Sequence, residues 1–172
     1  MDILISSDHA GFELKKKLYS YLKEQGHNIV DYGPHEFDPD DDYPDFIAPL
    51  AQEISQNSMS RGIIIGASGQ GEAMTANRFT GVRAMVYIGE PVPKDGRKLP
   101  NPIILSREHN DSNVLSLGAK FLSDDDAIQA VALWLKSDFS REERHMRRIR
   151  KMDSFHDDSQ NLPADSELYR ML

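Results

Sequence analysis

The 172-residue chain has no cysteine and no long apolar run. Without thiols it can form no disulfide, no thiolate metal site and no cysteine nucleophile. No apolar stretch approaches the roughly 20 residues that span a bilayer. The first residues, Met1 to Ile3, lead directly into a strand pattern and show no basic and apolar signal segment. We therefore expect a cytoplasmic protein with no membrane partner.

Positive charge is also scarce. The sequence has 20 Lys and Arg residues against 28 Asp and Glu residues, which gives a net charge of −8. This balance argues against a nucleic-acid partner, and it repels anionic small molecules unless basic side chains gather locally. They do gather in residues 141–151, where six basic and two acidic side chains give a local charge of +4. An anionic ligand therefore remains compatible with this acidic chain.

The length and the hydrophobic content of 39% suit one domain with a single core. Short apolar runs alternate with amphipathic stripes, which is typical of an α/β protein. The expected strands are residues 2–6, 27–32, 63–65, 82–88 and 113–117. The expected helices are residues 12–24, 43–56, 103–108 and 124–136, one that starts near Glu72, and one capped by Ser140. Residues 89–102 hold four prolines and two glycines, so we expect a long loop there.

The stretch from Ile63 to Arg78 carries the clearest chemical signal. Three isoleucines predict a buried strand, residues 66–71 form a glycine-containing loop, and a helix pattern follows. The N–H groups of residues 69–71 can converge on an anion or an oxyanion at the helix N-terminus. Glu72 lies in the same first turn, where a carboxylate can act as a base. The loop alone also fits an ordinary strand-to-helix turn that Glu72 caps, so both interpretations stay open at this point.

Asp8 and His9 follow the first expected strand, at the end where ligands bind in open parallel sheets. The same pair fits an N-cap followed by a surface histidine equally well. Farther along, residues 38–42 contain four aspartates. Their spacing lacks the glycine and the distal glutamate of a calcium loop, so a solvated acidic loop is favoured over a cation site.

The basic segment predicts a helix in which Ser140 is the N-cap and Glu143 completes a capping box. On that helix Arg144 and Arg148 are spaced i, i+4, so the two guanidinium groups could clamp a phosphate. A solvated face braced by Glu142 and Glu143 is the alternative, and composition alone favours it.

Six motifs follow one another along the chain, and together they are far more specific than any one of them. They are Ser-Asp-His-Ala-Gly-Phe-Glu-Leu-Lys (7–15), Asp-Tyr-Pro-Asp (42–45), Gly-Ala-Ser-Gly-Gln-Gly-Glu with Ala-Asn-Arg (66–78), Gly-Val-Arg-Ala (81–84), Arg-Glu-His-Asn-Asp (107–111) and Arg-His-Met-Arg-Arg (144–148). In this order the chain resembles the type B ribose-5-phosphate isomerase and galactose-6-phosphate isomerase family. The match covers about residues 1–152, which we expect to form a sugar-phosphate isomerase domain. Residues 153–172 would be a C-terminal extension that packs on the domain or on a partner subunit.

The resemblance implies a Rossmann-like three-layer sandwich with a five-stranded parallel sheet. It also implies a homodimer with shared active sites, with a tetramer as the alternative, and isomerisation of a phosphosugar without metal or cofactor. The expected reaction converts ribose 5-phosphate to ribulose 5-phosphate by ring opening and a cis-enediolate. One branch of the family has a cysteine base where this chain has Gly66. The other branch has a glutamate four residues after a loop Ser or Thr, and Ser68 with Glu72 matches that pattern.

The residues at the family's motif positions then take expected roles. Glu72 is the base, His109 opens the sugar ring with help from Asp8, and the loop amides hold the enediolate. The expected catalytic residues are Asp8, Ser68, Glu72 and His109. The expected substrate-binding residues are Asp8, His9, Tyr43, Ala67, Ser68, Gly69, Gln70, Gly71, Asn77, Asn110, Lys120, Arg144 and Arg148, of which His9, Arg144 and Arg148 match the phosphate contacts and Tyr43 and Asn77 line or brace the pocket. No metal ligand is expected.

Two departures from the family pattern leave the sugar open. Lys120 stands where an arginine usually reaches the phosphate, so the charge is kept but the bidentate geometry is lost. Residues 89–102 contain an insertion of about ten residues relative to a family loop of ordinary length. An isomerase for another pentose, tetrose or hexose phosphate is therefore an alternative. A non-catalytic sugar-phosphate or nucleotide-binding protein is another, although the loop at 66–71 matches neither common nucleotide fingerprint.

Overall fold

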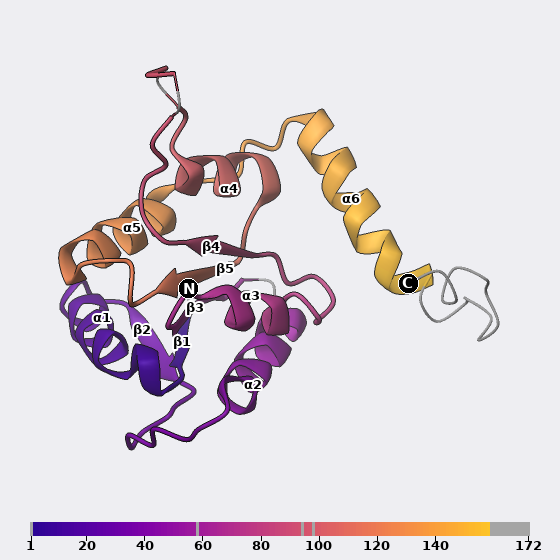
Figure 1. Cartoon of the computed structure of the whole chain (residues 1–172). Coiled ribbons are helices and arrows are strands. Elements are labelled where there is room, and N and C mark those ends of the chain that lie inside the picture. The colour runs from indigo at the N-terminus through magenta and orange to yellow at the C-terminus, as the bar shows by residue number, and fades with distance from the viewer. Residues whose placement is uncertain (1, 58, 94, 98, 159–172) are drawn as a thin grey trace, which may run out of the picture. The chain divides into compact units, whose positions relative to one another are not determined.

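The computed structural model describes residues 2–57, 59–93, 95–97 and 99–158. Contacts within the chain divide it into two units, Met1–Ser140 and Arg141–Leu172. The first unit contains a five-stranded parallel sheet in the order β2-β1-β3-β5-β4 (Figure 1). Its strands are β1 (Asp2–Ser7), β2 (Asn28–Asp31), β3 (Arg61–Gly66), β4 (Ala84–Tyr87) and β5 (Val114–Gly118). Its helices are the short 3₁₀ helix η1 (His9–Gly11), α1 (Phe12–Glu24), α2 (Tyr43–Gln56), α3 (Gln70–Ala76), α4 (Pro102–Asn110) and α5 (Asp124–Lys136).

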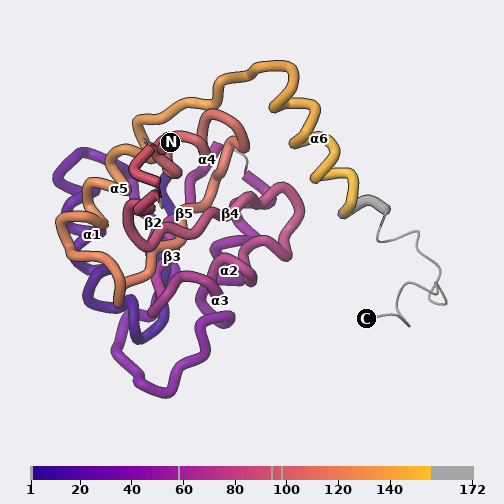
Figure 2. The backbone as a smooth tube through the Cα atoms, turned by 45° about the horizontal axis from the view of Figure 1, so that its top comes forward, coloured from indigo at the N-terminus to yellow at the C-terminus, as the bar shows by residue number. Residues whose placement is uncertain are grey.

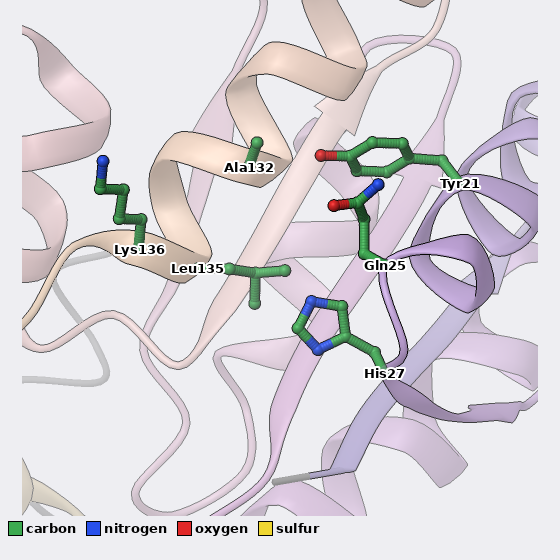
Figure 3. Close-up of a pocket in the computed structure, with 6 residues that line it drawn as sticks. All are labelled: Tyr21, Gln25, His27, Ala132, Leu135 and Lys136. Atoms are coloured by element: carbon green, nitrogen blue, oxygen red, sulfur yellow. The ribbon is translucent and has the colours of Figure 1, made fainter.

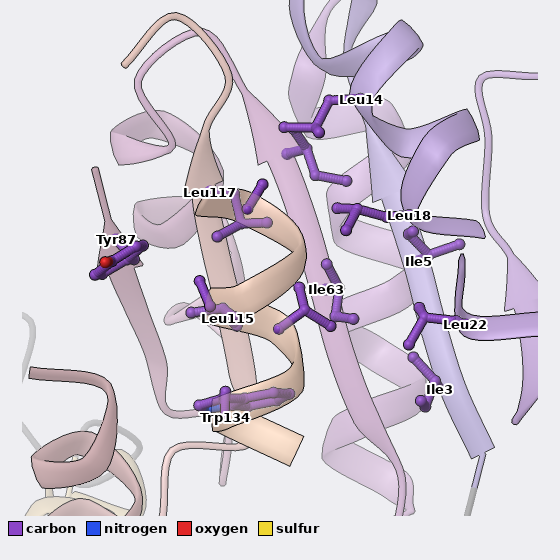
Figure 4. Close-up of a cluster of buried hydrophobic side chains, with 14 of the residues drawn as sticks. Ile3, Ile5, Leu14, Leu18, Leu22, Ile63, Tyr87, Leu115, Leu117 and Trp134 are labelled. Atoms are coloured by element: carbon purple, nitrogen blue, oxygen red, sulfur yellow. The ribbon is translucent and has the colours of Figure 1, made fainter. Parts of the chain in front are cut away.

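The helices cover both faces of the sheet, which makes three layers (Figure 1). Helices α1 and α5 pack on one face, and α2 and α3 pack on the other. Successive strand residues point to opposite faces, so Ile3 and Ile5 meet the first pair of helices while Leu4 meets the second. Figure 4 shows the larger cluster, in which the Leu14, Leu18 and Leu22 stripe of α1 faces the strands. Because both faces are buried, the central strands read as continuous apolar runs in the sequence.

The order of the strands reverses between β1 and β3. The chain passes from β1 to β2 on one side and then returns to place β3 on the other side of β1. The loops that follow β1 and β3 therefore diverge at the carboxyl edge of the sheet, where open α/β sheets bind ligands. The segment between β2 and α2 leaves the sheet at the same edge as an extended loop, which the backbone tube makes clear (Figure 2).

The sequence predicts the regular elements of this unit closely. Helices α1, α2 and α5 begin and end at the expected residues, and all five expected strands are present within a few residues of their expected ends. The described residues between 89 and 101 form no helix or strand, in line with the long loop expected at 89–102. At its end the Asn101 side chain accepts hydrogen bonds from the N–H groups of Ile103 and Ile104. Asn101 therefore caps α4, whose first residue is a proline that lacks an N–H group.

The second unit is described over residues 141–158 and contains α6 (Glu143–Asp158). The prediction that Ser140 caps this helix is wrong. The helix starts only at Glu143, after Arg141 adopts a left-handed φ of 55°, so its N-cap position falls at residue 142. The Ser140 N–H donates to the Glu108 carbonyl at 3.2 Å. In the described part of the chain, no helix is both long enough and apolar enough to cross a bilayer. The expected packing of residues 159–172 lies outside the described residues.

Candidate active site

Asp8 directly follows the buried strand β1 and holds the turn that comes next. Its N–H donates to the Ile65 carbonyl at 3.2 Å, and its carboxylate accepts from the Gly11 N–H at 3.0 Å. A Cβ at Gly11 would collide with the Ile65 carbonyl, so only glycine lets η1 approach β3 this closely. Asp8 is therefore the N-cap that the sequence allowed, and it is 6% exposed at the carboxyl edge.

The glycine loop closes against the end of β5. Gly69 has a left-handed φ of 75°, and its carbonyl accepts a 2.6 Å hydrogen bond from the buried Ser116 hydroxyl. Helix α3 starts at the next residue, so its first N–H groups are left without partners inside the helix and face out of its N-terminus. The Tyr43 ring lies over this turn, since a Cβ on Gly71 would be 2.8 Å from its Cζ atom. The loop is therefore fixed by the Ser116 hydroxyl and covered by the Tyr43 ring.

Glu72 is the buried carboxylate of this site, with 4% of its surface exposed. Burial raises the pKa of Glu72, its own backbone N–H acts against the rise, and the nearby negative charge of Asp8 adds to it. The carboxyl group occupies space that only a glycine at position 66 leaves free. A Cβ on Gly66 would overlap all three atoms of the carboxyl group, the farthest of which, Oε2, would be 2.6 Å away. Gly66 is therefore a residue of the site, a role that the sequence interpretation did not give it.

His9 is held by an aspartate that the sequence interpretation placed in solvent. The His9 Nδ1 atom lies 2.6 Å from Asp41 Oδ1, and the His9 N–H donates to the same oxygen at 3.1 Å. Asp38 and Asp40 are exposed as expected, but the Asp41 side chain is only 5% exposed. The expectation of a solvated acidic loop is therefore wrong for Asp41, because folding brings residue 41 against the loop that follows β1. In the described chain, no group of three or more His, Asp or Glu residues is arranged to hold a metal ion.

Lys120 completes the edge from the end of β5. Its N–H donates to the Ala67 carbonyl at 3.0 Å, which ties the residue to the glycine loop. Its charge also acts on the His9 imidazole, so the exposed ammonium group lies on the side of the site where His9 is found. The carboxyl edge therefore gathers ten of the expected residues: Asp8, His9, Tyr43, Ala67, Ser68, Gly69, Gln70, Gly71, Glu72 and Lys120.

Three expected residues lie at the opposite edge of the sheet. His109 and Asn110 end α4, just before β5 begins, while Glu72 follows the end of β3. Paired residues of β3 and β5 run in parallel from Gly62 to Gly66, four steps of about 3.3 Å, so about 13 Å of strand separates the two edges. Asn77 also lies at the amino edge, where its amide exchanges two hydrogen bonds with Ala84 at the start of β4. Within one chain, the expected ring-opening histidine therefore does not meet the expected base.

The end of α4 that carries His109 is rigidly held. Arg83 donates to the Asn110 and Asp111 carbonyls at 3.0 and 3.1 Å and pairs with the Asp111 carboxylate at 3.0 Å. Arg107 pairs with the same carboxylate at 2.8 Å, and Asp111 turns through a left-handed φ of 45°. These contacts fix the direction of α4 where it reaches the amino edge. Sequence patterns give no hint that this edge would carry part of the expected machinery.

Arg144 and Arg148 lie on α6 in the second unit. Arg144 pairs with Glu142 at 2.8 Å, and both side chains are more than half exposed, so the bracing of this face by acidic residues is partly confirmed. The i, i+4 spacing on one helix is also confirmed.

The hollow shown in Figure 3 is separate from the carboxyl edge. It has a volume of about 320 Å³ and lies between the C-terminal turns of α1 and α5, where Tyr21, Gln25 and His27 face Leu135. It contains none of the expected site residues; its lining is Tyr21, Gln25, His27, Ala132, Leu135 and Lys136. The candidate site therefore remains the carboxyl edge around Glu72.

Comparison with known proteins identifies relatives of this chain. Residues 3–152 match the family model described as Ribose/Galactose Isomerase. The chain is 39% identical over 152 residues to the probable ribose-5-phosphate isomerase B of Mycoplasma genitalium, covering 88% of this chain and 93% of that protein. The crystal structure of ribose-5-phosphate isomerase B from the same organism, with bound ribulose-5-phosphate, superposes with a TM-score of 0.81 at 37% identity and covers 91% of this chain and 96% of the other. The enzyme of Clostridium thermocellum gives a TM-score of 0.80 at 34% identity, covering 92% and 99%.

The family model spans most of the chain, and these relatives share more than 30% identity over nearly their whole length. The five-stranded parallel sheet, the glycine loop and the buried glutamate lie within the matched residues 3–152. The chain therefore belongs to the ribose/galactose isomerase family, on the side of the type B ribose-5-phosphate isomerases.

Proposed function

We propose that this protein interconverts ribose 5-phosphate and ribulose 5-phosphate, with Glu72 as the base that moves the proton between C2 and C1. The observation that carries the proposal is the buried Glu72 carboxylate, seated in the space left by Gly66 beside the N-terminus of α3. A base there acts on a carbon whose neighbouring oxygen is stabilised by the N–H groups of residues 69–71. The relatives named ribose-5-phosphate isomerase B support the choice of sugar.

The proposed reaction moves one proton from C2 to C1 and one from the C2 oxygen to the C1 oxygen, and no electrons leave the sugar. After the ring opens, Glu72 removes the proton from C2, the C–H electron pair forms the C1–C2 double bond, and the C1 carbonyl oxygen becomes an enediolate oxygen. The C2 hydroxyl proton passes to the C1 oxygen, the C2 oxygen becomes the ketone, and the same carboxylic acid returns its proton to C1. Loop N–H groups at a helix N-terminus stabilise the enediolate oxygen without needing to reorganise. No step of this proposal requires a metal ion or a redox cofactor.

We further propose that a second copy of the chain completes the site. Glu72 and His109 lie at opposite edges of the sheet in one protomer, so a ring-opening His109 has to come from another protomer. Asn110 adjoins His109 at the rigid end of α4 and would enter the same site. Arg144 and Arg148 would add the positive charge that a phosphate needs in an acidic chain.

The function is tested by offering the purified protein ribose 5-phosphate, allose 6-phosphate and galactose 6-phosphate, each with and without EDTA. We expect ribulose 5-phosphate to form from ribose 5-phosphate at a rate that EDTA leaves unchanged, because Glu72 and the loop amides do the chemistry. Preference for a hexose phosphate would reassign the sugar and direct attention to the loop at 89–102. Tight binding without turnover of any of the three would overturn the assignment as an isomerase.

A substitution at Gly66 tests whether the position of the Glu72 carboxylate is important for catalysis. Gly66→Ala adds one methyl group that overlaps the Glu72 carboxyl group, so the base must move out of its pocket. We expect kcat to fall by about 100-fold or more, since a misplacement of about 1 Å costs that much. Steady-state kinetics beside a thermal melt would measure this. Normal kcat in a folded variant would show that the base tolerates displacement and would count against the assigned geometry.

A further inference from the structure

One carboxylate oxygen of Asp41 accepts two hydrogen bonds from the same residue. Asp41 Oδ1 receives the His9 backbone N–H at 3.1 Å and lies 2.6 Å from His9 Nδ1. An ionised carboxylate only accepts, so the proton in the second contact belongs to Nδ1. The two contacts fix both the main chain and the ring of His9, although 32 residues separate the partners. With Nδ1 committed to Asp41, the opposite ring nitrogen, Nε2, is left for a ligand.

Asp41 has no other evident reason to be buried. Its neighbours Asp38 and Asp40 are exposed, as short acidic loops usually are, but the Asp41 side chain is 5% exposed. Its second oxygen, Oδ2, is buried without a hydrogen-bond partner in the described part of the chain. Burying a half-satisfied carboxylate destabilises the fold, and such arrangements concentrate at functional sites. Ser7 Oγ, beside Asp8 at the same edge, is likewise buried without a partner among the described residues.

The charges around His9 are few and can be named. Asp41 and Asp8 are negative, and Lys120 is positive. The hydrogen bond to Asp41 raises the pKa of His9 above its ordinary value near 6.5, burial acts against this, Asp8 adds to the rise, and Lys120 opposes it. At neutral pH the imidazole is therefore held closer to its doubly protonated form than a free histidine would be.

We propose that Asp41 is a positioning residue for the phosphate of the substrate, which holds the His9 ring through Nδ1 and directs its Nε2–H toward that phosphate. This inference rests on the proposed function, because it assumes that the ligand is a phosphosugar. A fixed imidazolium supplies a charge-assisted hydrogen bond at a defined position, which Lys120 alone, a flexible point charge, does not. Asp41 itself does not touch the substrate and acts through His9.

The test compares Asp41→Asn with Asp40→Asn, a matched loss of one charge at the adjacent, exposed position. Asparagine can still accept from the His9 N–H and Nδ1–H, so the backbone contact survives and only the charge is lost. We expect KM for ribose 5-phosphate to rise about tenfold with kcat within about twofold, the scale of exchanging a charge-assisted hydrogen bond for a neutral one. Asp40→Asn should leave both constants unchanged.

The pH dependence separates positioning from a general loss of structure. Without the Asp41 charge, His9 loses its proton at a lower pH than in the wild type, so the KM ratio of variant to wild type should be largest between the two titration midpoints of His9. The ratio should fall toward one as the pH is lowered below both titration midpoints of His9. A ratio that is constant across this range would mean that Asp41 acts only through structure, and an unchanged KM would overturn the proposal.

Three further measurements keep the proposal distinct from the function on which it rests. An NMR titration of His9 needs no substrate, and Asp41→Asn should lower its pKa, whereas an equal pKa would overturn the proposal even in an active enzyme. If no phosphosugar is turned over, the dissociation constant for inorganic phosphate takes the place of KM. This constant should be about tenfold higher for Asp41→Asn than for the wild type. In a His9→Asn background, adding Asp41→Asn should cause no further loss, because both residues act through one contact.

Discussion

Glu72→Gln is expected to reduce kcat by about 10²–10⁴-fold, the usual contribution of a positioned acid or base, while KM changes little. Glutamine keeps the shape that fills the space above Gly66, so the loop and the pocket stay intact. It cannot accept a proton from carbon, so the step from C2 to C1 loses its carrier. Steady-state kinetics with ribose 5-phosphate, together with direct binding of the sugar phosphate, would separate the two constants.

Glu13→Gln is the matched control for this substitution. Glu13 also lies in the first turn of a helix, α1, but its side chain is 72% exposed. It should behave as the wild type. If Glu72→Gln retained normal turnover, the proton would have to be carried by another group, and the assignment of the base would be wrong.

The acid limb of the kcat profile provides a second check on Glu72. A base works only when deprotonated, and burial raises the pKa of Glu72 above the ordinary 4.5. Activity should therefore be lost as the pH falls through that raised pKa, with the midpoint above pH 4.5. The profile of kcat, rather than of kcat/KM, reports groups in the bound complex and so excludes the free sugar phosphate's own ionisation. A midpoint at or below 4.5 would contradict the buried environment of the base.

The sequence predicts elements best where burial decides them. The stripes on α1 and α5 recur at helical spacing because one face of each helix packs on the sheet, so their ends follow from the pattern. Ser140 shows the limit of such rules. A capping residue followed by Glu143 is a good local signal, but Ser140 bonds to Glu108 across the fold and Arg141 turns the chain before the helix begins.

Some residues of the candidate site could likewise be predicted from local sequence, and others could not. Glu72 could be predicted because strand, glycine loop and first helical turn are consecutive in the chain. The roles of Gly66 and Asp41 could not be predicted. The role of Gly66 depends on the Cβ atom that glycine lacks, and the role of Asp41 depends on a contact with His9, which is distant in the sequence. An empty Cβ position leaves no mark in a hydrophobic pattern, and four aspartates in a loop look alike until folding buries one of them. The placement of His109 at the amino edge likewise follows only from the parallel register of β3 and β5.

The second large effect is expected when two inactive variants are combined. Under our proposal Glu72 of one copy works with His109 of the other. A mixed dimer of Glu72→Gln and His109→Asn then has one site with both lesions and one site with none. Co-expression with two different affinity tags, followed by purification on both, isolates such dimers. Their activity should recover from near zero in each parent to about half of the wild-type value per dimer, since one of two symmetric sites is intact.

The control for this experiment combines Glu72→Gln with Gly66→Ala. Both residues lie on the same edge of the same chain and share one contact, so every site in that mixed dimer carries a lesion and no activity should return. Recovery in the first mixture and none in the second would establish that each site takes residues from two chains. If purified mixed dimers of the first kind stayed inactive, His109 would have no part in a site with the Glu72 of another chain. The 13 Å of strand between the two edges would then exclude His109 from the chemistry altogether, because it cannot reach Glu72 within its own chain.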